Sequence, residues 1–161
     1  MAAHYDVVVT VGDPTSVRAQ GDPAALDLLD IHTEGDTLVA AVKSNVQWPA
    51  NARVTLNVTT PTLAAGEIKG SGEMRIGAVH ADALSLDLDG SGDVDAQELT
   101  LKKLTVTSGG SGEVNAGGIA DEADIRLSGS GDAELTSLTV KRADVSVSGS
   151  GSLSIEATER V

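Results

Sequence analysis

Four acidic residues recur along the second half of the chain at nearly constant spacing. Glu73, Asp93, Glu113 and Asp132 each follow a Gly-Ser-Gly triplet, and Ser152 holds the same place after the last triplet. Carboxylate oxygens and the carbonyl oxygens of glycine-rich turns are the ligands that Ca²⁺ takes in proteins. A column of carboxylates at this spacing could therefore hold calcium between neighbouring repeats.

A solvated acidic stripe is the alternative to a metal site. Like charges about 5 Å apart in water repel by only about 1 kcal/mol per pair, so a column of carboxylates needs no cation to exist. The triplets also lack the second acidic position of the calcium-binding nonapeptide repeat, Gly-Gly-x-Gly-x-Asp. We therefore expect a solvated stripe and no cofactor, with calcium as the alternative.

The serines of the triplets resemble part of the hydrolase motif Gly-x-Ser-x-Gly, in which serine is the nucleophile. Here the spacing differs, the serines are equivalent in every repeat, and no helical pattern follows them. The histidines, His4, His32 and His80, are scattered without ligand spacing, and we interpret them as incidental. The sequence thus predicts no catalytic residue.

Trp48 is the single tryptophan, and it precedes Pro49 in a polar stretch. An amphipathic ring in such a place is a candidate anchor for a carbohydrate or protein partner. The interpretation we favour is a lid packed over the open end of the fold.

The elements that must position these residues follow from the triplets. Gly-Ser-Gly occurs at 70–72, 90–92, 110–112, 129–131 and 149–151. A fixed period of this size is typical of stacked-repeat proteins, in which each unit completes its core against its neighbours.

Between the triplets, apolar residues form columns when the repeats are superposed. The columns are Met74, Val94, Val114, Ala133 and Leu153; Ile76, Ala96, Ala116, Leu135 and Ile155; Val79, Leu99, Ile119 and Leu138; Leu84, Leu104, Ala123 and Ala143; Leu86, Val106, Ile125 and Val145; and Leu88, Ser108, Leu127 and Val147.

Apolar and polar residues alternate within each repeat, as in 84–88 and 143–147, which is the period of a strand with one buried face. No helical pattern separates the strands, so each repeat must stack on the next. The predicted fold is all-β, a parallel β-helix with coils of about twenty residues. We expect it to be right-handed, because parallel crossovers overwhelmingly take that hand.

Residues 1–60 contain no triplet and read as less regular opening strands of the same solenoid. Residues 23–30 could hold one helical turn, with Asp22 as the N-cap and Pro23 at the first position. We expect one domain over 1–161, with 1–60 as the irregular opening and cap and 61–161 as the regular repeats.

Charge and composition exclude several classes of partner. The net charge of −13 makes nucleic acid and anionic membrane surfaces poor partners. Without cysteine there is neither a disulfide framework nor a thiolate metal site. No window is apolar enough to predict a spanning helix, and the first residues lack the pattern of a signal peptide.

Several segments together resemble the bacterial "putative auto-transporter adhesin, head GIN domain" family. They are 17–22, 26–30, the Gly-Asp-Thr-Leu element at 35–38, the strand at 54–58, 61–63, and the repeated Gly-Ser-Gly-Asp/Glu ladder. The resemblance implies a single-stranded β-helix, an exported or cell-envelope protein, and a role in adhesion. It therefore leads us to expect a periplasmic, surface or secreted protein whose signal peptide is not part of this sequence.

Two functions are compatible with the sequence. The first is a non-enzymatic module of the cell envelope whose flat polar faces bind a protein or a glycan. The second is a carbohydrate-active enzyme, because parallel β-helices also host such enzymes, but short coils and scarce aromatics favour the first. The exposed edge of the last coil, near 155–161, further predicts a homo-oligomer.

Overall fold

The computed structural model describes residues 5–12, 15–34, 37–43, 47, 49 and 51–160 of the chain. Trp48 and His4 lie outside these residues, so the lid and partner-contact interpretations of Trp48 stay predictions. The elements are β1 (Tyr5–Val11), β2 (Ser16–Gly21), α1 (Pro23–Leu26), β3 (Leu29–Glu34), β4 (Thr37–Val42), β5 (Val54–Thr60), β6 (Ala65–Gly70), β7 (Glu73–Ile76), β8 (Val79–Gly90), β9 (Asp93–Ser108), β10 (Glu113–Leu127), β11 (Asp132–Val147) and β12 (Leu153–Arg160).

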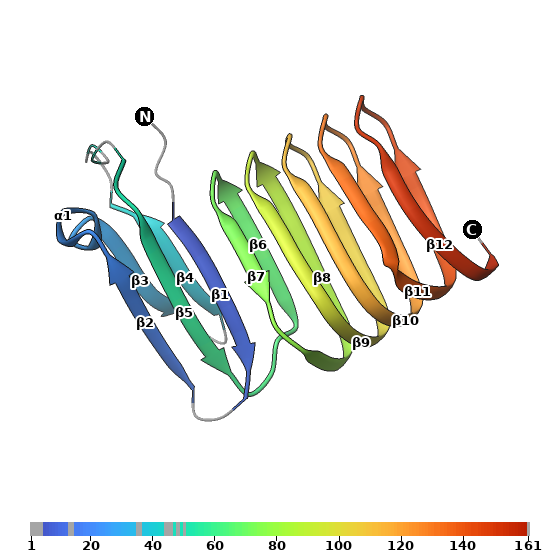
Figure 1. Ribbon diagram of the computed structural model, residues 1–161, viewed down its shortest axis with the longest axis horizontal. Coiled ribbons are helices and arrows are strands. Elements are labelled where there is room, and N and C mark those ends of the chain that lie inside the picture. The colour runs from blue at the N-terminus through green and yellow to red at the C-terminus, as the bar shows by residue number, and fades with distance from the viewer. Residues whose placement is uncertain are drawn as a thin grey trace.

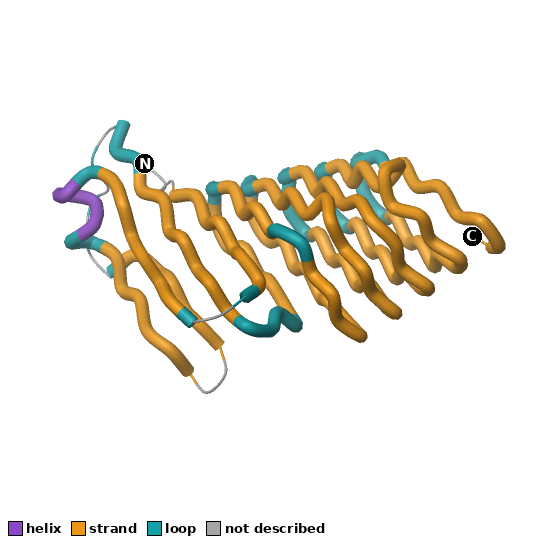
Figure 2. Tube along the Cα trace, turned by 60° about the horizontal axis from the view of Figure 1, so that its bottom comes forward, coloured by secondary structure: helices purple, strands orange, loops and turns teal. Residues whose placement is uncertain are grey.

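The second half of the chain is a β-solenoid, as the period predicts. β10 pairs in parallel with β9 on one side and with β11 on the other, so each coil lies against the coil before and after it (Figure 1). The register follows the repeat: Val114 lies opposite Val94 in β9 and opposite Ala133 in β11. The triplet turns of successive coils line up along one edge (Figure 2).

Each coil has three straight segments, which β9 illustrates. Buried and exposed residues alternate along β9 except at 97–98 and 102–103, where two successive residues are exposed and the chain bends. The triplet turn makes the third bend. We call the segments 79–81, 99–101, 118–120 and 138–140 the short face, and the segments 84–88, 104–108, 123–127 and 143–147 the long face.

The predicted columns form one continuous aliphatic core. Leu104, Val106, Ile125 and Leu135 are fully buried, and the cluster runs from Val9 to the last coil. The core contains one further column that the sequence analysis does not predict. It consists of Ala81, Leu101, Ala120 and Val140 on the short face, of which the last three are buried.

Two predicted core positions are wrong. β10 has one residue fewer than β9 between Ala116 and Gly118, where the register shifts. Gly118, with φ +115°, therefore takes the place opposite Leu99, and Ile119 is displaced to the surface with 57% of its area exposed. Val147 is 44% exposed because β12 pairs with β11 only up to Arg142.

Close stacking explains the glycines of the triplets. A Cβ on Gly112 would overlap the carbonyl oxygen of Gly92 in the preceding coil, and a Cβ on Gly131 would overlap that of Gly112. Among the triplet glycines that the structure describes, only Gly90 has a positive φ. The contact between backbones, more than the backbone angle, thus requires glycine at these turns.

The N-terminal part extends the sheet of the solenoid beyond β7. β1 lies between β5 and β7 and pairs in parallel with both, and β2 forms the antiparallel edge beyond β5 (Figure 1). β3 and β4 form a separate antiparallel pair. The predicted helical turn is α1, and the Asp22 carboxylate caps it by accepting the Ala24 N–H at 3.0 Å. A second apolar cluster, around Leu29, Val54 and Leu56, lies in this part.

Candidate binding surface

The predicted acidic column exists, and it begins one strand earlier than the triplets indicate. Val7 of β1 lies opposite Met74, which places Asp6 beside Glu73. Glu73 lies opposite Asp93, and Glu113 lies opposite Asp132. The column therefore runs from β1 to β11 with aspartate and glutamate alternating.

The aspartates of this column bind the backbone of the next coil. Asp93 Oδ1 accepts the Glu113 N–H at 2.8 Å, and Asp132 Oδ1 accepts the Ser152 N–H at 2.8 Å. Ser152 Oγ donates a second hydrogen bond to the same oxygen, also at 2.8 Å. These two bonds lower the pKa of the Asp132 carboxyl. Asp6 makes the corresponding contact with the Glu73 N–H at 3.2 Å.

The glutamates of the column pair along their own strands. Glu73 accepts hydrogen bonds from the Arg75 guanidinium at 2.7 and 3.3 Å, and Glu113 accepts one from Asn115 Nδ2 at 3.1 Å. The column is thus a series of contacts within and between coils. In the part of the chain that the structure describes, no three His, Asp or Glu residues are grouped so that they could hold a metal ion. The solvated stripe, with calcium binding as the alternative, stays a prediction.

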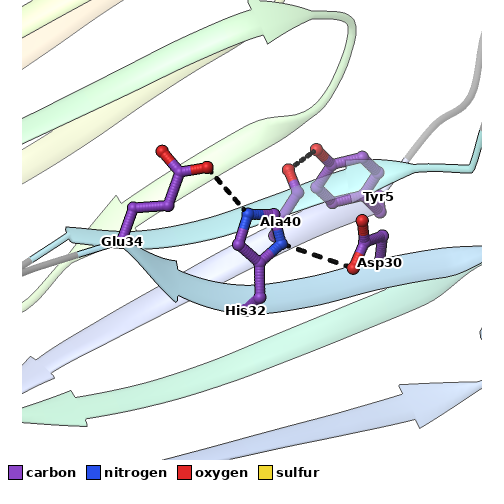
Figure 3. Close-up of polar contacts among 5 residues, drawn as sticks. All are labelled: Tyr5, Asp30, His32, Glu34 and Ala40. Carbon is purple, nitrogen blue, oxygen red and sulfur yellow. Dashed lines mark hydrogen bonds and ion pairs between the residues drawn. The ribbon is translucent and has the colours of Figure 1, made fainter.

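A histidine between two carboxylates lies on β3, in the N-terminal part of the molecule. His32 Nε2 lies 3.1 Å from Glu34 Oε1, and Nδ1 lies 3.3 Å from Asp30 Oδ1 (Figure 3). The hydrogen bond to Glu34, followed by the contact with Asp30, raises the pKa of His32. Asp-x-His-x-Glu on alternate strand positions is the sequence signal for this group, which the interpretation of His32 as incidental missed.

The adjoining strand is fixed by Tyr5, whose hydroxyl donates to the Ala40 carbonyl at 2.9 Å (Figure 3). Burial raises the pKa of the Tyr5 phenol. Since the side chains of Asp30, His32 and Glu34 are exposed, we interpret them as a surface ion-pair group along β3.

A shallow groove lined mostly by charged side chains lies beside the long face. One wall carries Lys103, Glu122 and Arg142 from three successive coils, and the other carries Asp124 and Asp144. Its floor is formed by two buried residues, Ala123 and Ala143. The walls present carboxylates and cations side by side on strands held in register.

Comparison with known proteins places these features in a family. The family described as "Putative auto-transporter adhesin, head GIN domain" matches residues 1–161. The chain belongs to this family. The resemblance drawn from the triplet ladder and the upstream elements is therefore confirmed.

Solved structures show the same fold. A putative adhesin from Bacteroides fragilis is 27% identical, with a TM-score of 0.90, and the alignment covers 96% of this chain and 75% of that one. A putative lipid binding protein from Parabacteroides distasonis is 20% identical, with a TM-score of 0.68 and coverage of 96% and 78%. A putative adhesin from the same species is 19% identical, with a TM-score of 0.65 and coverage of 96% and 77%. None of the curated proteins matches the chain.

The described residues contain no helix that is long and apolar enough to cross a lipid bilayer.

Proposed function

We propose that this chain is a non-enzymatic binding module of the bacterial cell envelope, located in the periplasm, on the cell surface or outside the cell. The family description and the adhesin from Bacteroides fragilis support a role in adhesion. The ligand is a protein or a glycan, and it binds the polar surface of the solenoid.

The groove between Lys103 and Asp144 is the observation that carries this proposal. Carboxylates accept hydrogen bonds from sugar hydroxyls or from backbone N–H groups, and Arg142 offers a planar fork of donors. Because the groove crosses three paired strands, its side chains are held at a fixed spacing without a loop that must order on binding.

Asp124 and Asp144 provide the variants that test it. Wild-type protein is applied to an array of defined glycans and to a panel of immobilised extracellular-matrix proteins. We expect binding to at least one probe, with a loss of tenfold or more, about 1.4 kcal/mol, in Asp124→Asn/Asp144→Asn. The matched control is Asp87→Asn/Asp89→Asn, which removes the same charge from β8, outside the groove.

Two results would contradict the proposal. Equal loss in both double variants would mean that charge alone governs binding and that the groove is not the site. Release of reducing sugar ends from a polysaccharide by the wild type would favour the alternative, a carbohydrate-active enzyme. Immunoblots of fractionated bacteria test the location.

A further inference from the structure

The bend between the short face and the long face carries charge in alternating blocks. We call it the charged corner. It consists of Asp82 and Ala83 in β8, Lys102 and Lys103 in β9, Asp121 and Glu122 in β10, and Lys141 and Arg142 in β11. Strand pairing stacks these blocks in order along the solenoid, with Lys103 opposite Glu122 and Glu122 opposite Arg142.

Neighbouring blocks pair within the chain. Lys102 lies 3.2 Å from Asp82, and Lys141 lies 3.1 Å from Asp121. These side chains remain largely exposed, at 85% for Asp82 and 74% for Lys102. Exposed pairs of this kind contribute about 0–1 kcal/mol each, so internal pairing leaves most of the corner available for other contacts.

From β8 to β11 the blocks are acidic, basic, acidic and basic. In the reverse order, from β11 to β8, the block at each position has the opposite sign. If a second copy lies antiparallel against the corner, the lysine block of β9 meets the acidic block of β10, and the cationic block of β11 meets Asp82. Every block then faces the opposite sign. In a parallel arrangement every block would face its own sign. A two-fold axis between β9 and β10 generates the antiparallel contact, as in an isologous dimer.

An exposed apolar side chain lies next to this axis. Ile119 on the short face is 57% exposed and flanks the acidic block of β10 by two residues. In the antiparallel arrangement the short faces of the two copies come together there, and Ile119 contacts the partner's coil near Thr100. The missing residue that displaces Ile119 from the core thus supplies an apolar anchor beside the complementary charges.

The net charge of the chain also favours the charged corner as the contact surface between two copies. The chain carries −13, which makes most of its surface repel a second copy. The charged corner is the exception, with four of the chain's eleven Lys and Arg residues against three carboxylates. From these observations we propose that the charged corner and the short face form a docking surface for an antiparallel second copy of this chain. The docking surface shares Lys103, Glu122 and Arg142 with the groove, but the proposal does not rest on the ligand of the groove.

Two reversed variants test this pairing. Lys102→Glu/Lys103→Glu and Asp121→Lys/Glu122→Lys each place equal charges across the two-fold axis in a self-pair. When the two variants are mixed, every block again faces the opposite sign. Sedimentation velocity at about 0.1 M salt is suitable, because the Debye length of about 10 Å leaves contacts intact but screens the rest of the molecule. The protein concentrations extend to about 1 mM, because a contact along a narrow corner is expected to be weak. Stable interfaces bury roughly 1,200 Å² or more.

We expect the wild type to associate reversibly, each reversed variant to stay monomeric, and their equimolar mixture to associate at least as tightly as the wild type. Ile119→Thr should weaken the wild-type association severalfold, whereas Val147→Thr, at an exposed apolar residue away from the corner, should leave it unchanged. Thermal melts confirm that each variant is folded.

Three outcomes overturn the proposal. If the wild type stays monomeric over the whole range of protein concentrations, the blocks form ion pairs only within the chain. Reversed variants that associate as tightly as the wild type place any dimer elsewhere. A mixture that fails to associate removes the antiparallel pairing. Because these measurements use no ligand of the groove, their failure is distinguishable from failure of the proposed function.

Discussion

The carboxylate of Asp93 accepts a hydrogen bond from the backbone N–H of Glu113, one coil further along the solenoid, at 2.8 Å. Asp132 repeats this contact with Ser152, and Asp6 makes it with Glu73. The aspartates of the acidic column therefore connect coils, beside the triplet turns where the regular strand ladder is interrupted.

Replacing Asp93 by alanine should lower the free energy of unfolding by about 0.5–1.5 kcal/mol, because the Glu113 N–H loses its acceptor. Asp93→Asn keeps an acceptor oxygen and should cost less. Thermal melts measure both. The control is Asp87→Ala, an exposed aspartate on the long face, which should change stability by less than about 0.5 kcal/mol. Equal stability of the two alanine variants would show that the inter-coil bond contributes nothing.

Calcium should stabilise the protein no more than sodium chloride does at equal ionic strength. The column oxygens already accept hydrogen bonds from Ser152, Glu113 and Arg75, which a cation would have to displace. Melting temperatures at about 5 mM CaCl₂ test this, because a specifically bound ion adds RT ln(1 + [L]/Kd). A calcium-specific rise that disappears in Asp93→Asn/Asp132→Asn would reverse the conclusion and establish a metal site.

Gly92→Ala should destabilise the fold by about 2–4 kcal/mol. Its Cβ would lie 2.5 Å from the Gly72 carbonyl oxygen and 2.9 Å from Ile68 Cγ2, so the stacked turns would have to separate. Gly77→Ala is the control, because its Cβ would meet only the Val9 carbonyl oxygen at 3.5 Å, an ordinary contact. Urea unfolding of both variants decides the matter. If Gly92→Ala unfolds at the wild-type concentration, close stacking does not require glycine at this turn.

Ser108→Ala should stabilise the protein by about 1 kcal/mol, or roughly 2–4 °C in melting temperature. Ser108 is 2% exposed between Leu88 and Leu127, and its Oγ has no hydrogen-bond partner among the described residues. Ser128→Ala is a useful comparison, since the Ser128 hydroxyl does donate to the Ser108 carbonyl at 3.4 Å. A lower melting temperature for Ser108→Ala would mean that its hydroxyl has a stabilising partner.

The pairing of His32 with Glu34 and Asp30 should make stability depend on pH. A raised pKa in the folded state means that His32 contributes stability below its unfolded pKa, about 6.5, and that this contribution is lost as pH rises through the raised value. The wild type should therefore exceed His32→Gln in melting temperature at about pH 5.5, and the difference should shrink at alkaline pH. His80→Gln controls for replacing an exposed histidine. A difference that stays constant with pH would contradict the pairing.

The periodic part of the fold could be predicted from the sequence because each coil buries the same positions. The prediction was wrong at Ile119, where counting from the preceding triplet crossed the missing residue next to Gly118. The repeat period does not predict that β1 lies between β5 and β7, because the residues that pair there are more than forty positions apart in the chain. The right-handed sense stays a prediction.

The candidate surfaces were harder to predict. The acidic column was expected, but its role was not, because the backbone N–H that Asp93 binds belongs to a coil twenty residues away. The groove depends on which outward residues of three coils lie together, and only the register shows that Lys103, Glu122 and Arg142 adjoin. Trp48 lies outside the described residues, so its role stays a prediction.

The position of β1 also sets an order of folding events. The ribosome makes β1 before its two neighbours, β5 and β7, which are complete only after residues 60 and 76 have been added. The coils after β7 can stack on each other as they appear, because their contacts are local to the repeat. β1 must instead wait as an unpaired, valine-rich strand. Premature pairing of this segment with another nascent chain is therefore the step at which synthesis of this protein is most exposed to aggregation.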